Sequence, residues 1–309
     1  MTETNPAVEL WERPAAPEVF MIAGWHQWAD AGNVSSRLPQ YLVELTEARR
    51  IGYLRDEGFY LFQVPGTHHF LRPEIKLRDG YRQSMEAYIN EFHYAEVNSK
   101  GLVIFLGHEP HLRALYYVET LLDAIQALGV RRVVALGGVY GALPYRRDRH
   151  IHCVYSLWGM KRQLERYGLI FSNYEGGSTI GTYLVDRAER RGLEVVDLYA
   201  FVPAYDFSEL SQTIPGLRID NDFKAWYDVM VRVNHMLGLG LDLSELERQS
   251  AGLIAAMDEK IAELERQTPV LRLRDFLDRL DREFTEVPFS ALDDTLEQEL
   301  GDLLDDIEA

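Results

Sequence analysis

The chain has almost no cysteine, has fewer basic than acidic residues, and contains no long apolar run. One of its 309 residues, Cys153, is a cysteine, which excludes an intramolecular disulfide and any metal site built from several cysteines. Cys153 lies in an apolar, strand-like stretch, so we expect a buried structural thiol rather than a nucleophile. A chain so poor in cysteine suits the reducing cytoplasm, where we expect the protein to reside.

The apolar segments are too short to cross a membrane. The longest lie at residues 101–107 and 133–138, whereas a transmembrane helix needs about 20 predominantly apolar residues. The first residues also lack the apolar segment of a secretory signal peptide. We therefore expect neither export nor a membrane partner.

Basic residues are outnumbered by acidic ones, 32 to 49, and the net charge is −17. A nucleic-acid-binding surface neutralises phosphates with lysine and arginine, so this balance argues against a nucleic-acid partner. The acidic excess is concentrated: residues 242–309 hold 20 acidic and 7 basic side chains, whereas residues 1–241 hold 29 and 25. A nearly neutral body is thus followed by an acidic segment.

The body alternates short apolar runs with helical periodicity, a pattern that predicts an α/β domain. Its clearest unit is a strand at 102–106, a helix at 112–128 with Leu115 among its inward residues, and a strand at 133–136. Such continuous apolar strands indicate a parallel sheet buried on both faces. Further strands are expected at 19–25, 151–157 and 195–201, and further helices at 34–48, 161–167, 180–191 and 223–237.

The segment between the first helix and residue 102 is less regular. Two extended stretches, 50–54 and 59–64, flank the sequence Asp-Glu-Gly, and this arrangement predicts a β-hairpin. Residues 65–100 contain two prolines and a polar stretch, so we expect them to be irregular.

These patterns divide the chain into an N-terminal arm at 1–17, an α/β domain at 18–241 and an acidic helical extension at 242–309. Glycines at 238–242 indicate a linker before the extension. Apolar residues three to four apart predict an amphipathic helix from 243 to 264, capped by Asp242 or Ser244.

Two more helices are predicted in the extension, at 273–284 and 292–307. The last has eight carboxylates and no basic residue after Ser290, so it needs a surface to pack against if it is to remain helical. That surface is either the chain's own domain or another protein.

Polar, glycine-rich segments follow the predicted strands, where open parallel sheets bind their ligands. Trp25, Asp30 and Gly32 precede a helix whose first backbone amides could receive an anion; alternatively, Asp30 caps that helix and Trp25 packs at the domain edge. Glu109 lies between two histidines, but Pro110 disfavours the regular helix that such a pair of metal ligands needs. We expect no metal.

Two later segments also follow strands. Gly138 permits close backbone approach, and Arg146 either binds a carboxylate or phosphate or pairs with the protein's own acids. Glu175 and Ser178 precede the helix at 180–191, where Ser178 or Thr179 would be the N-cap. This segment lacks the lysine of a P-loop and the pattern of a nucleophile elbow. We therefore predict no catalytic serine and no cofactor.

Taken in order, five segments resemble the proteasome assembly chaperone 2 family. They are Gly24-Trp25 with Asp30-Ala31-Gly32, Gly107 with Glu109-Pro110, Leu136-Gly137-Gly138 with Pro144 and Arg146, Tyr174-Glu175-Gly176, and Val202-Pro203-Ala204-Tyr205. The resemblance covers about residues 18–240 and rests on the ordered set. It implies a three-layer α/β/α sandwich similar to phosphorylase/hydrolase-like folds, and a homo-oligomer, for which a trimer is one candidate form. The extension is similar to that of actinobacterial-type members.

The chain departs from the family pattern at three places. Tyr145 and Ala204 stand where the family often has histidine, and Gly177 stands where it often has proline. Neither Tyr145 nor Ala204 exchanges a proton near neutral pH, so a general acid–base role cannot be carried over. These departures weigh against an enzyme.

Two functions remain open at this stage. The favoured one is a non-catalytic, assembly chaperone-like or scaffold protein that self-associates and binds another protein through its extension or its loops. The alternative is a binder of a nucleoside-, phosphate- or carboxylate-type molecule, or a phosphorylase/hydrolase-like enzyme, with its pocket at the sheet's carboxyl edge. The residues expected around that pocket are Trp25, Asp30, Gly32, Glu109, Gly138, Arg146, Glu175, Ser178 and Tyr205.

Overall fold

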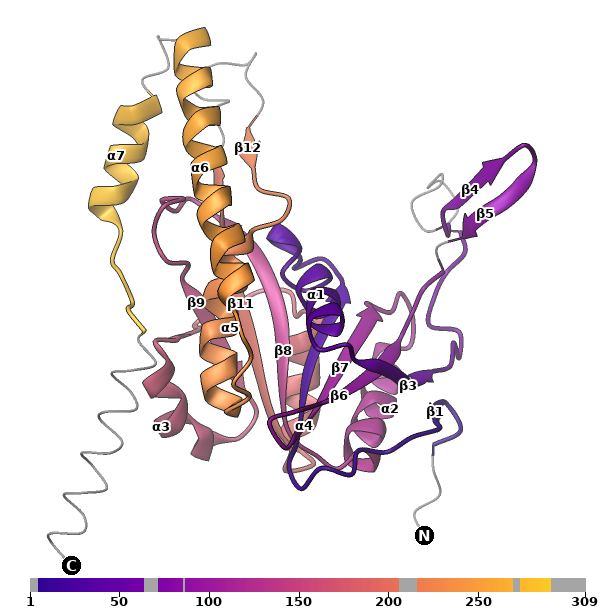
Figure 1. Ribbon diagram of the computed structural model, residues 1–309. Helices are drawn as coiled ribbons and strands as arrows, with labels where there is room; N and C mark the ends of the chain where they lie inside the picture. Colours follow the sequence, from indigo (N-terminus) through magenta and orange to yellow (C-terminus); the bar gives the residue numbers. More distant parts are fainter. Residues whose placement is uncertain (1–4, 64–71, 86, 206–215, 269–272, 290–309) are drawn as a thin grey trace, which may run out of the picture.

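A large, mostly parallel sheet forms the centre of the protein (Figure 1). The computed structural model describes residues 5–63, 72–85, 87–205, 216–268 and 273–289. Within these ranges the sheet has ten strands in the order β1-β3-β6-β7-β2-β8-β11-β9-β10, with β12 beside β11. The strands are β1 (Val8–Leu10), β2 (Val19–His26), β3 (Arg49–Leu54), β6 (Glu91–Val97), β7 (Lys100–His108), β8 (Val130–Gly141), β9 (Ile151–Tyr155), β10 (Ile170–Phe171), β11 (Glu194–Tyr205) and β12 (Leu217–Arg218).

The parallel part of the sheet comprises β7, β2, β8 and β11. On one side, β6 and β3 continue it with antiparallel pairing. On the other side, β9 is antiparallel to β11, and β10 is parallel to β9. No helix links β8 to β9, and without a crossover helix a strand returns antiparallel.

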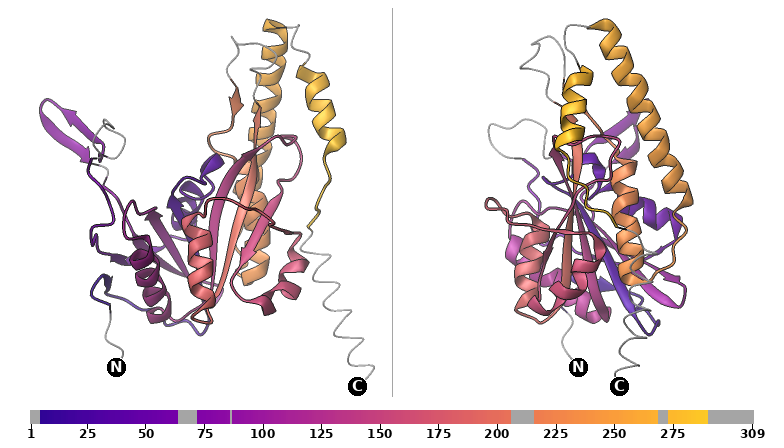
Figure 2. Two further views of the ribbon diagram at one scale, coloured as in Figure 1. Left: turned by 180° about the vertical axis from the view of Figure 1, so that it is seen from behind. Right: turned by 90° about the vertical axis from the view of Figure 1, so that its left-hand side faces the viewer.

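Helices cover both faces of the sheet and make three layers, as the view along its edge shows (Figure 2). On one face lie α1 (Arg37–Leu45) and α5 (Phe223–Leu237), and on the other α2 (Ala114–Ala127) and α4 (Ile180–Glu189). The short helices η1 (Ala31–Asn33), η2 (Trp158–Met160), α3 (Lys161–Leu164) and η3 (Glu165–Tyr167) lie in the connections. The predicted α/β/α sandwich is confirmed.

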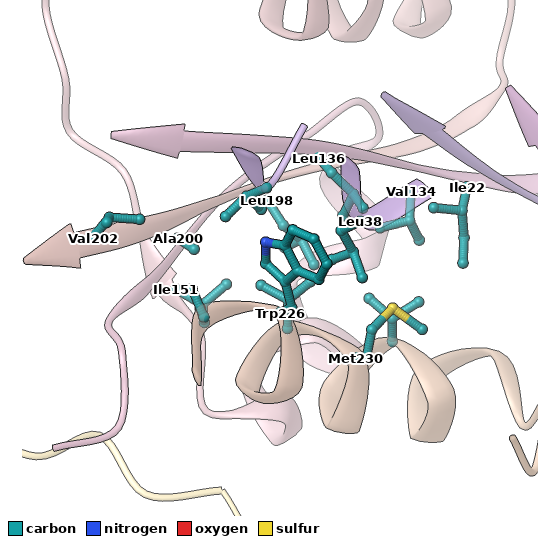
Figure 3. Packing of buried hydrophobic residues seen from close by; sticks show 14 of the residues in the cluster. Ile22, Leu38, Val134, Leu136, Ile151, Leu198, Ala200, Val202, Trp226 and Met230 are labelled. Atoms are coloured by element: carbon teal, nitrogen blue, oxygen red, sulfur yellow. The ribbon is translucent and has the colours of Figure 1, made fainter. Parts of the chain in front are cut away.

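The larger core lies between the sheet and α5. Trp226 of α5 packs beside Leu38 of α1 and against Leu136 and Leu198 of the sheet (Figure 3). Its indole nitrogen Nε1 donates a hydrogen bond to the carbonyl oxygen of Gly32 at 2.9 Å. Burial of this side chain therefore also fixes the loop that follows β2.

The predicted helical extension begins after Gly238, whose φ of 57° ends α5 in the left-handed region. Its helices α6 (Ser244–Gln267) and α7 (Leu273–Glu283) lie side by side, and they extend beyond the sheet (Figures 1 and 2). Leu246, Met257 and Ile261 of α6 are buried in the core shared with α5. The third predicted helix, 292–307, lies outside the described residues.

Several expectations for the first half of the chain are wrong. Residues 50–54 form no hairpin with 59–64, because β3 pairs with β1 and β6, and residues 59–63 are not a strand. Phe59 is apolar for another reason: its ring packs edge-on against Tyr117, 5.1 Å between centroids. Leu115 was expected to face inward, but it lies in the first turn of α2 and is 49% exposed.

The described part of the segment expected to be irregular contains β6 and a separate two-stranded ribbon. The ribbon consists of β4 (Ile75–Arg78) and β5 (Tyr81–Met85) and projects away from the body (Figure 1). We call residues 75–85 the β-arm. None of the helices in the described ranges combines the length and the apolarity that a membrane crossing requires.

Candidate functional site

The carboxyl ends of β2, β7 and β8 bring three of the predicted segments together. The parallel register places His26 beside His108, and an isolated bridge joins Asp30 to Gly138. Glu109 accepts a hydrogen bond from the backbone amide of Trp28 at 3.2 Å. The loop after β2 is therefore held from both sides.

Asp30 has the structural role rather than the ligand-binding role considered from the sequence: it binds backbone amides near the start of α1. Its Oδ1 atom accepts hydrogen bonds from the amides of Ser35 at 2.8 Å and Ser36 at 3.0 Å. Burial raises the pKa of Asp30, although its hydrogen bonds with Ser36 and Ser35 oppose the shift. The backbone amides before α1 that could donate hydrogen bonds to an external anion therefore already donate to this carboxylate.

Three of the predicted residues determine the conformation of this loop and offer no side chain to a ligand: Trp25, Gly32 and Gly138. Trp25 is 1% exposed and donates from Nε1 to the hydroxyl of Tyr117 at 3.0 Å. Gly32 adopts a φ of 64°, which favours glycine. A Cβ atom on Gly138 would lie 2.0 Å from the carbonyl oxygen of Ala31, so this close approach also requires glycine.

A cavity of about 590 Å³ opens beside this loop, on the face of the sheet that carries α4. It lies between the carboxyl-terminal parts of β8 and β11 and the first turn of α4, since Val139, Phe201 and Thr182 are all among its lining residues. We call it the aromatic cavity. Its lining is Trp28, Ala29, Val139, His152, Val154, Ser172, Asn173, Tyr174, Gly176, Gly177, Ser178, Thr179, Thr182, Tyr199 and Phe201.

A buried polar network lies along one wall of the aromatic cavity. Thr179 is the N-cap of α4 and forms a capping box with Thr182. Of the two residues predicted as this cap, Ser178 and Thr179, the structure therefore uses Thr179. The Thr179 hydroxyl also bonds to that of Tyr199, which in turn donates to Asp197 Oδ2 at 2.5 Å. Burial raises the pKa of Asp197 to about 7.

Arg146 lies at a second cavity, of about 780 Å³, between the loop after β8 and the helices α6 and α7. Its Nη2 and Nε atoms donate to Oδ1 of Asp258 at 2.7 and 2.9 Å. The neighbouring Arg147 pairs with Asp281 at 2.7 Å and Glu286 at 2.5 Å, and its hydrogen bond lowers the pKa of Asp281. Both arginines thus pair with the chain's own acids, one of the two alternatives for Arg146.

The remaining predicted residues have separate surroundings. Tyr205 is buried, donates its hydroxyl hydrogen to the carbonyl oxygen of Leu143 at 2.7 Å, and packs edge-on against Phe276 of α7. Glu175 is exposed, and Ser178 alone of the predicted set lines the aromatic cavity. The predicted residues therefore do not form one pocket. Arg146 and Ser178 line different cavities, and the others belong to the loops after β2, β7 and β8, are buried, or are exposed.

Sequence reasoning missed most of the residues that line the aromatic cavity. Phe201 and His152 lie on strands, and only the register of β11 with β9 and β8 brings them to one face. Trp28 carried a usable signal, since it is an aromatic residue in a polar loop directly after a strand. Among the described residues, no group of three or more His, Cys, Asp or Glu could hold a metal ion.

Comparisons with known proteins give a consistent result. The model of the PAC2 family matches residues 24–262. The crystal structure of a PAC2 family protein from Streptomyces avermitilis is 24% identical, with a TM-score of 0.66 over 78% of this chain and 95% of that chain.

A proteasome-assembly chaperone homologue from Mycobacterium tuberculosis is also 24% identical, with a TM-score of 0.66 over 79% of this chain and 96% of that chain. A protein of unknown function from Corynebacterium glutamicum has a TM-score of 0.72 at 16% identity, over 90% of this chain and 97% of that chain. No curated protein sequence matches the chain.

Proposed function

This chain belongs to the PAC2 family, and from that premise we propose that it is a non-catalytic, assembly chaperone-like or scaffold protein. In this proposal residues 18–241 form the body and residues 242–309 an interacting extension. The protein self-associates, with a trimer as one candidate form, and binds another protein. A cytoplasmic location fits its single buried thiol, Cys153.

The proposal draws support from the roles of the predicted polar side chains. Asp30 and Glu109 accept hydrogen bonds from backbone amides, Arg146 pairs with Asp258, and Tyr205 donates to a backbone carbonyl. Groups committed in this way hold the fold together. They are poorly placed to transfer protons to or from a substrate.

The observation that carries the proposal is the β-arm. Its side chains Ile75, Leu77, Tyr81 and Met85 are each at least half exposed, and Ile75 faces Met85 across the two strands. An isolated two-stranded ribbon is marginally stable in water, and exposed apolar side chains in a group mark protein-binding surfaces. A partner that covers the β-arm would stabilise it.

Charge favours a second copy of the chain as one such partner. The β-arm carries Lys76, Arg78 and Arg82 against the single acid Asp79, whereas the extension holds 20 acidic and 7 basic residues. Opposite charges on separate surfaces of one chain favour head-to-tail association. We therefore place the acidic extension of one copy against the β-arm of another.

Two experiments test the proposal. Light scattering during size-exclusion chromatography should give a multiple of 35.6 kDa, and Leu77→Asp combined with Tyr81→Asp should return the mass toward that of one chain. Trp158→Asp is the matched control, because Trp158 is a large exposed residue outside the β-arm. A wild-type protein that is monomeric at every concentration would refute self-association.

The second experiment tests partner binding in the cell. A photo-crosslinking residue at position 77 should form protein adducts, and the same residue at position 158 should form few. Equal labelling at the two positions would remove the β-arm from the proposal.

A further inference from the structure

The aromatic cavity has the features of a ligand site that the scaffold proposal does not require. We infer that it binds a small, neutral, planar aromatic or heteroaromatic molecule. Its volume, about 590 Å³, falls within the range of roughly 300–1,000 Å³ typical of small-molecule pockets. The inference goes beyond the proposed function, since neither the β-arm nor the extension contributes to the cavity.

Aromatic rings supply the floor and the rim of the cavity. On the floor, the rings of His152 and Phe201 lie 4.3 Å apart between centroids, and Val139 is the partner of Phe201 in the register of β8 with β11. At the rim, Trp28 is 74% exposed and Tyr174 is 65% exposed. A flat ligand entering between rim and floor can stack on both sets of rings.

The charge of the lining selects a neutral ligand. No lysine, arginine, aspartate or glutamate is among the lining residues. Burial lowers the pKa of His152, which keeps its ring neutral near pH 7. An ionised ligand would lose hydration here without gaining a counter-charge. This argues against the phosphate- and carboxylate-type ligands considered from the sequence.

The polar groups of the lining suit the edge of a heteroaromatic ring. The side chains of Ser178 and Asn173 are exposed, and within the described part of the chain neither they nor the ring of His152 form a hydrogen bond with the protein. Each can donate to or accept from a ring nitrogen or a ring carbonyl. By contrast, the hydroxyls of Thr179 and Tyr199 are already engaged with each other.

Fragment binding to the full-length protein tests the inference. Indole, benzimidazole and adenine are titrated by ligand-observed NMR saturation transfer near neutral pH, each beside a carboxylated counterpart. At least one neutral compound should bind, and its carboxylate should bind roughly tenfold more weakly. Binding by none of the three, or equal binding of the charged and neutral forms, overturns the inference.

Variants locate the binding. Trp28→Ala should weaken it roughly tenfold, whereas Trp158→Ala, which removes an exposed tryptophan elsewhere, should not. Gly177 lines the cavity, and a Cβ there would meet nothing within 4 Å, so the fold should tolerate a larger side chain. The ring in Gly177→Phe should then compete with the ligand for the cavity. Gly159→Phe is its control, because Gly159 has the same open surroundings and lies outside the lining. Binding that survives both Trp28→Ala and Gly177→Phe would overturn the assignment.

Discussion

Arg149 and Asp222 form a buried, two-point ion pair. The Nε and Nη2 atoms of Arg149 lie 2.8 and 3.2 Å from the two carboxylate oxygens of Asp222, and the side chains are 1% and 0% exposed. Asp222 also caps α5 by accepting from the amide of Ala225 at 3.0 Å, and its own amide donates to Gly32. Through its carboxylate and its backbone amide, Asp222 thus joins the loop before β9, α5 and the loop after β2.

Asp222→Asn should therefore be strongly destabilising. The substitution leaves the Arg149 guanidinium buried without a counter-charge, which costs about 3–5 kcal/mol of unfolding free energy. Urea unfolding followed by circular dichroism measures the loss. Glu12→Gln, which breaks the exposed pair of Glu12 with Arg49, is the control and should have a far smaller effect. Similar losses in both variants would contradict the role given to burial.

Asp197 should make stability depend on pH. Its folded-state pKa of about 7 exceeds the value of about 3.9 of an unfolded chain. The folded state therefore retains a proton that the unfolded chain releases, so this stabilisation is complete below about pH 4 and is lost as pH rises through 7. Asp197→Asn should remove a slope of up to about 1.4 kcal/mol per pH unit between these values. Urea unfolding at a series of pH values measures it.

A second variant distinguishes this cause from other buried carboxyls. The hydroxyl of Tyr199 donates a hydrogen bond to Asp197, and this bond lowers the pKa of Asp197. Tyr199→Phe removes the bond and should raise that pKa further. The pH window should then move upward in Tyr199→Phe and vanish in Asp197→Asn. Stability curves that run parallel in all three proteins would show that Asp197 does not titrate as described.

Arg147 should hold α7 to the body. Its pairs with Asp281 and Glu286 are exposed, and salt screens exposed pairs. Arg147→Ala should speed hydrogen exchange in residues 273–283, and raising the salt concentration should do the same to the wild type. Arg248→Ala is the control, because its pair with Glu245 lies within α6. Unchanged exchange in Arg147→Ala would mean that apolar contacts alone hold α7.

Gly138→Ala should destabilise the protein through one close contact. The added Cβ would lie 2.0 Å from the carbonyl oxygen of Ala31, and overpacking of this kind costs about 1–3 kcal/mol. Gly252→Ala is the opposite case: it lies inside α6 with nothing within 4 Å of its Cβ position, so it should gain up to about 1 kcal/mol of helix propensity. Thermal unfolding of the two variants checks the difference in sign.

The fold could be predicted where a segment's burial is uniform along its length. The strand at 102–106 and the helix at 223–237 were found because continuous or periodic apolar residues identify core elements. β6 was missed because its sequence, Glu-Phe-His-Tyr-Ala-Glu-Val, alternates with polar residues and follows a polar stretch. Phe59 misled because an apolar residue in a loop can be buried as deeply as one in a strand.

The candidate site was harder to predict because its residues meet through long-range pairing. Arg146 is separated by more than one hundred residues from Asp258, its partner, and no local pattern connects the two. Thr179 could be predicted as a cap because it lies next to its own helix. Asp30 could be predicted as a structural carboxylate because the amides that it accepts from are only five and six residues away. The aromatic cavity depends on strand register, which the sequence of a fully buried parallel strand does not specify.

The two outermost strands of the large sheet limit how copies of this protein can join. β1 has three residues and β10 has two, so each edge offers very few backbone groups to a neighbouring strand. Short edges of this kind prevent one sheet from continuing into the next. Copies of this chain that associate are therefore expected to do so through side chains rather than by extending the sheet at β1 or β10.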